Sequence, residues 1–189
     1  LSTPSPILNK NCNRLPPANS DEIRILYQGN MSLSRGLERF INAMKYLPKQ
    51  YKLIFVGDGP DEKRLSELIY HANVKDKVII LGRVPNRELH MISSVCNIGI
   101  VTYPYSGLNN IYCAANKIFE YALAGLPVIT TDQPPLKNKI KKYEIGLCIT
   151  CKDTPETIAK NIIFLASKAK TEYKDKLKIF IDNYKWEDE

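Results

Sequence analysis

Long apolar runs, histidine and tryptophan are scarce in this chain. Its 189 residues include two histidines and one tryptophan, and the longest apolar runs, such as the one at 78–81, are short. A helix needs roughly 20 mostly apolar residues to cross a bilayer, and the beginning of the chain does not have the pattern of a signal peptide. The sequence therefore predicts no membrane-spanning segment.

The cysteines lack a regular pattern. Their number is odd and they are scattered over the chain, at Cys12, Cys96, Cys113, Cys148 and Cys151. A secreted disulfide framework is therefore not expected, and a reducing cytoplasm fits better. Cys148 and Cys151 form a CxxC motif, but without a second pair they do not predict a zinc or redox site. No metal site is expected.

A dinucleotide-binding fingerprint is also missing. In the loop Gly57-Asp-Gly-Pro60, the pattern GxGxxG needs its last glycine where Glu62 stands. No acidic residue ends a second strand. An oxidoreductase with a nicotinamide cofactor is therefore disfavoured.

Acidic residues are outnumbered, with 20 against 27 lysines and arginines and a formal net charge of +7. An anionic partner has to be considered, whether nucleic acid, a membrane surface or a phosphorylated small molecule. Much of the excess lies at spacings typical of solvated helix faces, at Lys137, Lys139, Lys141, Lys142, Lys168, Lys170, Lys174, Lys176 and Lys178. Solvation explains these lysines more simply than a nucleic-acid surface, which would give binding with a steep salt dependence.

Short β-rich runs alternate with segments of helical periodicity, as in a parallel sheet covered by helices. We expect strands at 23–27, 51–56, 78–81, 98–101, 127–130 and 146–150. Helices are expected from the apolar stripes at 37–47 and 65–72, then near 86–94, 115–124 and 135–143, with two more in 155–184. This predicts an α/β fold, Rossmann-like, with three α/β/α layers and a parallel sheet of about six strands. Residues 1–22, rich in Pro, Asn and Ser, are expected to be a linker or extension, and 23–189 one domain.

The loops that follow strands are the candidate binding elements, because ligands of parallel sheets lie outside the carboxyl ends of the strands. The first, 29–36, places Arg35 beside a helix start, which suits a phosphate as well as a plain turn with a solvated arginine. The second, 57–60, has glycines that permit a tight turn near a ligand, although by itself an ordinary strand-to-helix turn explains it better. The third, 103–116, leads into another helix start.

Glu120 is the most informative residue after these loops. It is the one acid among apolar neighbours in its helix, and a carboxylate in apolar company needs a polar partner, for which a sugar hydroxyl would serve. Asn116 precedes it by one helical turn, where free amides and Lys117 could bind a phosphate. The alternative is an ordinary surface ion pair between Lys117 and Glu120.

Several blocks, in order, resemble the C-terminal, nucleotide-sugar-binding domain of GT-B glycosyltransferases, in particular retaining family 4, the glycosyl transferases group 1. The strongest is Asn116-Lys117, Phe119-Glu-Tyr121 and Ala124-Gly-Leu-Pro-Val128, similar to the family pattern NK-x-x-E-Y-x-x-x-G-x-P-V. Gly57-Asp-Gly-Pro60, Gly82-Arg-Val-Pro85 and Tyr184-Lys-Trp186 are similar to further family segments. The resemblance runs from about residue 23 to residue 186.

This resemblance implies roles for individual residues. Glu120 would accept hydrogen bonds from the donor's ribose, Arg35 would hold the diphosphate, and Arg83 or Val84 would meet the base through backbone atoms. Two positions depart from the family: Tyr112 stands where its first glutamate is expected, and Asn30 where an arginine is. The implied catalytic residues are Arg35, Lys117 and Glu120. The implied donor-binding residues are Gly29, Asn30, Gly57, Arg83, Val84, Ala115, Asn116, Lys117 and Glu120.

The implied activity is transfer of a hexose, with retention and without a metal or other cofactor, from a nucleoside diphosphate sugar that is UDP- or GDP-linked. A missing N-terminal domain would supply the acceptor site, and the isolated domain would be inactive. The enzyme would be cytoplasmic, in bacterial surface polysaccharide or lipopolysaccharide synthesis, with a peripheral position on the inner face of the membrane if the acceptor is lipid-linked. No nucleic-acid partner is expected. The alternative is a non-catalytic nucleotide-binding subunit that works with a separate acceptor-binding chain.

Overall fold

The computed structural model describes residues 14–113, 116–168 and 170–184. Within them lies one six-stranded parallel sheet, as the alternating sequence pattern predicted. The strands are β1 (Ile23–Gln28), β2 (Tyr51–Val56), β3 (Val78–Ile80), β4 (Ile98–Val101), β5 (Val128–Thr131) and β6 (Gly146–Ile149). Their order in the sheet is β3-β2-β1-β4-β5-β6, which is the doubly wound Rossmann-like arrangement.

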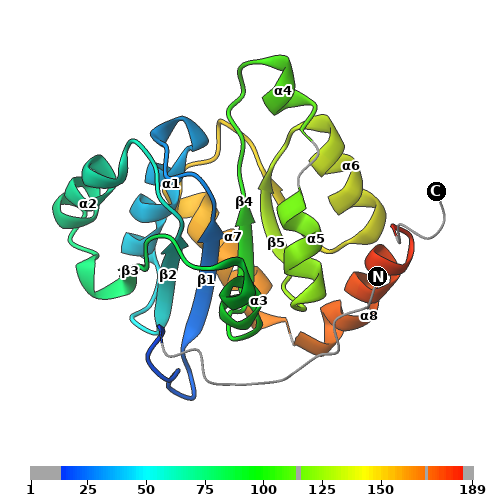
Figure 1. The fold of residues 1–189 in the computed structure, drawn as a ribbon, viewed down its shortest axis with the longest axis horizontal. Coiled ribbons are helices and arrows are strands. Elements are labelled where there is room, and N and C mark those ends of the chain that lie inside the picture. Colours follow the sequence, from blue (N-terminus) through cyan, green and yellow to red (C-terminus); the bar gives the residue numbers. More distant parts are fainter. Residues whose placement is uncertain (1–13, 114–115, 169, 185–189) are drawn as a thin grey trace.

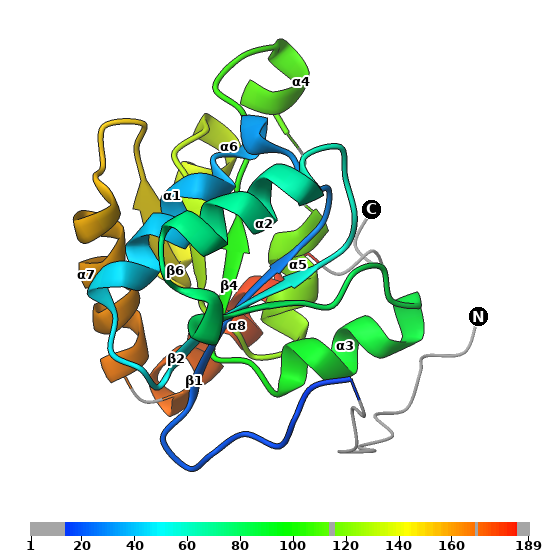
Figure 2. The ribbon, with the colours of Figure 1, turned by 90° about the vertical axis from the view of Figure 1, so that its left-hand side faces the viewer.

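Helices cover both faces of this sheet. The α-helices are α1 (Leu37–Ala43), α2 (Glu62–His71), α3 (Asn86–Ser94), α4 (Leu108–Ile111), α5 (Asn116–Leu123), α6 (Pro134–Tyr143), α7 (Pro155–Ser167) and α8 (Lys170–Asp182), with short 3-10 helices η1 (Leu33–Arg35), η2 (Met44–Tyr46) and η3 (Lys75–Lys77). Helix α1 packs against α2 and α7 on one face, and α8 packs against α5 and α6 on the other. Figure 2, a view along the sheet, shows α1 and α7 on one side of the strands and α3 and α5 on the other.

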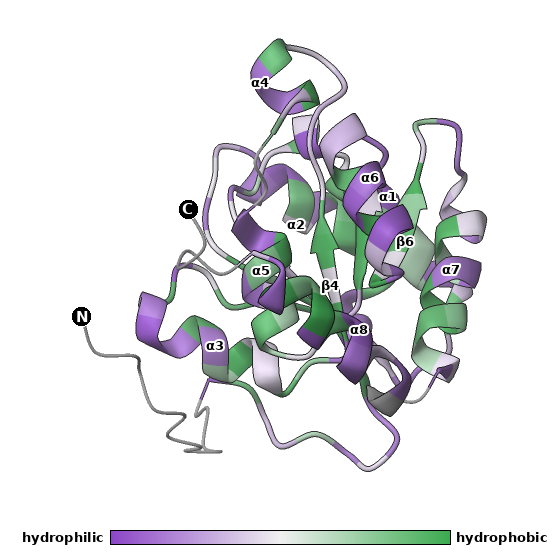
Figure 3. Cartoon of the chain, turned by 90° about the vertical axis from the view of Figure 1, so that its right-hand side faces the viewer, coloured by the Kyte–Doolittle hydropathy of each residue, from purple (hydrophilic) through white to green (hydrophobic). Residues whose placement is uncertain are grey.

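The core consists of the strands and the apolar stripes of the helices. The predicted stripe of the first helical segment is fully covered, with Leu37, Phe40, Ile41, Met44 and Leu47 all buried. Parallel strands buried on both faces read as continuous apolar runs, which is why these six were recognisable. In Figure 3 the strands inside are mostly coloured as hydrophobic, whereas many residues of α3 and α6 on the outside are hydrophilic. Among the described residues, no helix combines the length and hydropathy needed to cross a membrane.

Two local features differ from the sequence prediction. The first helical segment ends as the 3-10 helix η2, so its α-helical part stops at Ala43. The short helix α4 lies inside the segment 103–116, for which the sequence predicts a loop, and Figure 1 shows it beyond the end of the sheet. Its four residues include exposed Leu108 and no buried side chain, so no apolar periodicity marked it.

Candidate functional site

The topological switch point of the sheet lies between β1 and β4, the two neighbouring strands whose connections leave in opposite directions. Ligands of doubly wound sheets bind in the crevice outside the carboxyl ends of such strands. Gln28 ends β1, and Thr102 follows β4. Six of the predicted site residues come from the described segments that follow these two strands: Gly29, Asn30, Arg35, Asn116, Lys117 and Glu120.

The loops that follow β1 and β2 are tied to neighbouring segments through their backbones. The Gly29 N–H donates to the Val56 carbonyl, and the Gly57 N–H donates to the Gly82 carbonyl, both at 2.9 Å. A Cβ at Gly57 would lie 2.0 Å from the Gly29 carbonyl oxygen, and its φ of +129° also favours glycine. The amides of Gly29 and Gly57 are thus committed within the protein. Because these residues have no side chain, the two loops can approach each other closely. This packing between the loops accounts for the glycines without a ligand beside them.

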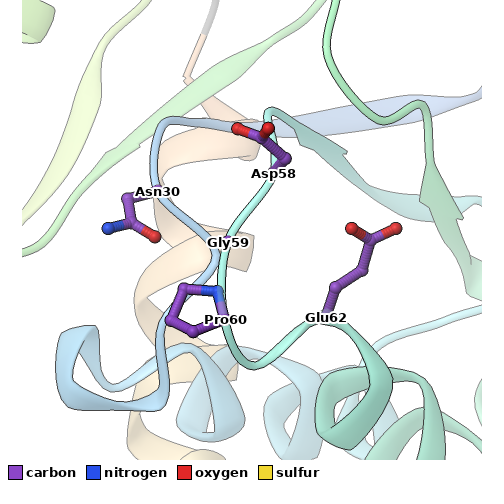
Figure 4. Close-up of a pocket in the computed structure, with 5 residues that line it drawn as sticks. All are labelled: Asn30, Asp58, Gly59, Pro60 and Glu62. Carbon is purple, nitrogen blue, oxygen red and sulfur yellow. The ribbon is translucent and has the colours of Figure 1, made fainter.

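A broad hollow of about 560 Å³ opens beside these loops, lined by Asn30, Asp58, Gly59, Pro60 and Glu62. Figure 4 shows Asn30 on the first loop and the two carboxylates on the segment that begins α2. Asp58 pairs with Arg83 at 3.0 Å, and the Arg83 side chain is 80% exposed. Two acids in its lining make this hollow a poor place for a diphosphate. Asn30 and Arg83, predicted as donor-binding residues, therefore lie by the acidic hollow, whereas the side chain of Val84 is buried.

Arg35 connects the loops of the two switch-point strands. It ends η1, whose first amides are held by Ser32 and by the carboxylate of Asp61. Its guanidinium donates to the Thr102 carbonyl at 3.1 Å and lies 4.8 Å from the centre of the Tyr103 ring. Neither contact carries a formal negative charge, so the cation keeps its capacity to attract an anion. Burial raises the pKa of the Tyr103 hydroxyl, which Arg35 partly opposes, and Tyr103 stays neutral.

A second pocket, of about 410 Å³, lies between α3 and α5 at the end of β1. Its lining is mixed, with an acid, a lysine, a histidine, two amides, a hydroxyl and two apolar side chains: Gln28, Asn86, Leu89, His90, Ser93, Lys117, Glu120 and Leu123. A concave surface with a few convergent polar groups is the usual form of a small-molecule site. Of the predicted site residues, this pocket brings together Lys117 and Glu120.

Glu120 has polar partners in this pocket. Lys117 donates to both of its carboxylate oxygens, at 2.8 and 2.9 Å, and the Gln28 amide nitrogen donates to Oε2 at 2.6 Å. The Glu120 side chain is 42% exposed, so our expectation of a purely apolar setting was wrong. Residues that are adjacent in a helical sequence point to different faces of the helix, so the apolar residues next to Glu120 do not surround its side chain. The i,i+3 ion pair that we kept as the alternative is present, and the carboxylate still faces the pocket.

Tyr121 fixes α5 to the sheet directly beside Glu120. Its buried hydroxyl accepts from the Gln28 N–H at 3.0 Å and donates to the Leu26 carbonyl at 3.3 Å. Burial keeps the pKa of this hydroxyl well above its usual value, so it remains a donor. Gly99 in β4 leaves room for the ring, because a Cβ there would lie 2.5 Å from it. The position of Glu120 thus depends on contacts with both switch-point strands.

Sequence reasoning missed Gln28 and the hydroxyl of Tyr121. Gln28 could have been noticed as a polar residue that ends the mostly apolar run of β1. Its partner Glu120 is 92 residues away, and no local pattern connects them. Tyr121 matched the family block, but its part in holding α5 emerges only from the fold.

Four other positions complete the comparison with the sequence. Asn116 is exposed at the first turn of α5, whereas Ala115 and Trp186 lie outside the described residues. Tyr112, at the family's first glutamate position, follows α4 and is 66% exposed. Its side chain supplies no carboxylate for a donor sugar.

The cysteine pair remains a pair of thiols. Burial raises the pKa of the Cys148 thiol, whose sulfur lies 3.4 Å from the Thr130 hydroxyl, and Cys151 is exposed. In the part of the chain that the structure describes, no three His, Cys, Asp or Glu side chains are grouped so that they could hold a metal ion.

Comparisons with known proteins identify the family to which this sequence is similar. A model of the family described as glycosyl transferases group 1 matches residues 13–183. An uncharacterized glycosyltransferase of Methanocaldococcus jannaschii, MJ1607, is 27% identical over 141 residues, which make up 74% of this chain and 34% of that protein.

Solved structures share the fold. WaaG, a glycosyltransferase involved in lipopolysaccharide biosynthesis, superposes with a TM-score of 0.71 at 16% identity, over 89% of this chain and 45% of its own. HepE of Anabaena, in complex with UDP, gives a TM-score of 0.71 at 18% identity, over 86% and 45% of the two chains. The chain thus spans about a third of its curated relative's length and less than half of these solved chains.

Proposed function

The chain belongs to the glycosyl transferases group 1 family, and on that premise we propose that it binds the nucleotide-sugar donor of a GT-B glycosyltransferase. The observation that carries this proposal is the placement of Lys117 and Glu120 in one pocket at the switch point, with Gln28 behind the carboxylate. A carboxylate accepts hydrogen bonds from the two neighbouring hydroxyls of a ribose, and an ammonium binds phosphate. Both groups stand one helical turn apart on α5.

The diphosphate would lie toward Arg35 and the beginning of α5. When a nucleoside diphosphate leaves the sugar, negative charge grows on the β-phosphate, and fixed cations and amides stabilise it. Arg35, Lys117 and the first amides of α5 would supply this stabilisation, so the proposal needs no metal. The acceptor would attack from the face that the leaving group departs, with retention, and a phosphate oxygen would help to take its proton.

The acceptor site would belong to a further, N-terminal domain that closes the cleft. A UDP- or GDP-linked hexose is the proposed donor, and the UDP bound to HepE supports a nucleoside diphosphate in this fold. The part that WaaG takes in lipopolysaccharide biosynthesis supports a surface-polysaccharide product and a lipid-linked acceptor at the inner membrane face. By itself the chain should bind donor without turnover.

The test is calorimetric titration of the chain with UDP, GDP and ADP, followed by the sugar conjugates of whichever binds. We expect one-site binding of one nucleoside diphosphate. If none of the three binds, while duplex DNA binds tightly at moderate salt, the proposal is wrong.

Replacing Arg35 by alanine should weaken the binding of UDP by about tenfold, because one charge-assisted hydrogen bond to phosphate contributes roughly 1.5 kcal/mol. Uridine, which has no phosphate, should bind the variant and the wild type equally. The matched control is Arg64→Ala, which removes the same charge from an exposed position on α2. If Arg64→Ala weakens UDP as much as Arg35→Ala does, the effect comes from net charge and Arg35 does not touch the diphosphate.

A further inference from the structure

The Gln28 side chain is unusual among the buried residues of the sheet. It is 4% exposed, and its amide nitrogen donates to Glu120 at 2.6 Å. Because a carboxylate only accepts, the nitrogen must face Glu120, which leaves the amide oxygen on the other side. That oxygen is buried and has no hydrogen-bond partner among the described residues. An apolar side chain at the end of β1 would avoid this cost, so the amide needs a reason to be there.

The hydrogen bonds of Glu120 supply the reason. A carboxylate has about four acceptor positions, two on each oxygen. Gln28 and Lys117 together occupy both positions of Oε2, and Lys117 takes one of Oε1. Only one position remains for a ligand while Lys117 is in place. When Lys117 turns toward a phosphate, each oxygen has a free position, and Gln28 still holds the carboxylate in its orientation.

We propose that Gln28 is the positioning residue of Glu120 and thereby makes the site selective for ribose over 2′-deoxyribose. The proposal rests on the proposed function and names the sugar discrimination of the same site. Without Gln28, Glu120 would be held by Lys117 alone, a flexible cation that the diphosphate attracts away. The carboxylate would then be free to rotate, and the second ribose hydroxyl would lose its fixed acceptor. Selectivity of this kind depends on groups that are fixed before the ligand arrives.

The experiment compares UDP with 2′-deoxy-UDP by calorimetry, or GDP with 2′-deoxy-GDP if the site takes guanine. Wild type should prefer the ribose form by about tenfold or more, as one well-placed hydrogen bond allows. Gln28→Met, which keeps the length of the side chain and removes the amide, should reduce this ratio by about tenfold. In the Glu120→Ala background the same substitution should leave the ratio unchanged, because its effect passes through Glu120.

A matched control is Gln133→Met. Gln133 is also buried, at 3% exposed, also has a partnerless amide oxygen within the described part of the chain, and donates to the carbonyls of Tyr103 and Pro104 instead. This variant should keep the ribose preference whatever it does to overall affinity. If Gln28→Met fails to fold, as its thermal melt would show, Gln28→Asn keeps the amide but is too short to hold Glu120 and should lower the ratio equally.

The outcomes separate this inference from the proposed function. If the wild type binds no nucleoside diphosphate, the proposed function fails. If the wild type binds UDP with a preference for ribose, and a folded Gln28 variant keeps that preference, the role of Gln28 is refuted while the function stands. A ratio that falls in the Gln133 variant, or one that Gln28→Met still changes without Glu120, also refutes it.

Discussion

Glu120→Ala should weaken the binding of UDP by about 100-fold, the largest effect that we expect of any single side chain in the pocket. A hydrogen bond to a charged group contributes roughly 1.5–3 kcal/mol, and the carboxylate would accept two from the ribose. The binding free energy lost with these two hydrogen bonds exceeds the free energy gained when Lys117 is released from its ion pair and can bind the diphosphate. Glu120→Gln keeps the shape of the side chain but has only one acceptor oxygen. Its affinity for UDP should therefore lie between those of Glu120→Ala and the wild type. Calorimetry with UDP measures all three.

The same substitution should lower the stability of the fold by only about 1–3 kcal/mol, chiefly because the amide nitrogen of the buried Gln28 loses its partner. Lys117 and Glu120 are both partly exposed, at 33% and 42%, and such a surface pair contributes about 0.2–1 kcal/mol. A matched control is Glu156→Ala on α7, which breaks the exposed pair of Glu156 with Lys160 on the other face of the sheet. Glu120→Ala should therefore melt somewhat below Glu156→Ala, because only Glu120 holds a buried amide, and only Glu120→Ala should lose UDP. Equal affinity for UDP in both variants would show that Glu120 is a surface pair and nothing more.

The fold was predictable because its signals are local. Each buried strand is a short apolar run between polar segments, and each helix repeats apolar residues on one face, so neighbours along the chain suffice to place them. The order of elements then restricts the sheet to few topologies, since parallel connections are right-handed and short. Arg35, Lys117 and Glu120 could also be chosen as candidates from the sequence, because they stand in loops or at helix starts that follow strands.

The surroundings of these residues were not predictable, since they join distant parts of the chain. The contact of Glu120 with Gln28 exists only because β1 and β4 are neighbours in the sheet, a non-local fact that no periodicity encodes. The structural need for Gly57 was hidden for the same reason. Gly57 fits a ligand turn when read alone, but its missing Cβ is needed for the carbonyl of Gly29 on another loop. Local patterns thus identify candidate residues, whereas the order of the strands in the sheet determines which other residues each candidate contacts.

Gly99→Ala should lower stability by about 3 kcal/mol, because the new Cβ would lie 2.5 Å from a ring that has no room to move. Tyr121 is fully buried, and its hydroxyl is bonded to the backbone of β1 at both Gln28 and Leu26. For a chain of this size, the melting temperature should fall by about 6–12 °C. The affinity for UDP should fall as well, since a displaced Tyr121 carries Glu120 with it.

Gly125→Ala is the comparison that isolates the steric part of this effect. Gly125 has a φ of +75° and open space around its Cβ position, so alanine there should cost about 1 kcal/mol from backbone strain alone. A double-mutant cycle gives the second check, because Tyr121→Leu removes the ring that the new methyl group meets. In that background Gly99→Ala should cost clearly less than in the wild type. A Gly99→Ala variant that melts like Gly125→Ala, or that loses the same stability with and without the ring, would mean that Tyr121 does not hold α5 and its carboxylate against β1.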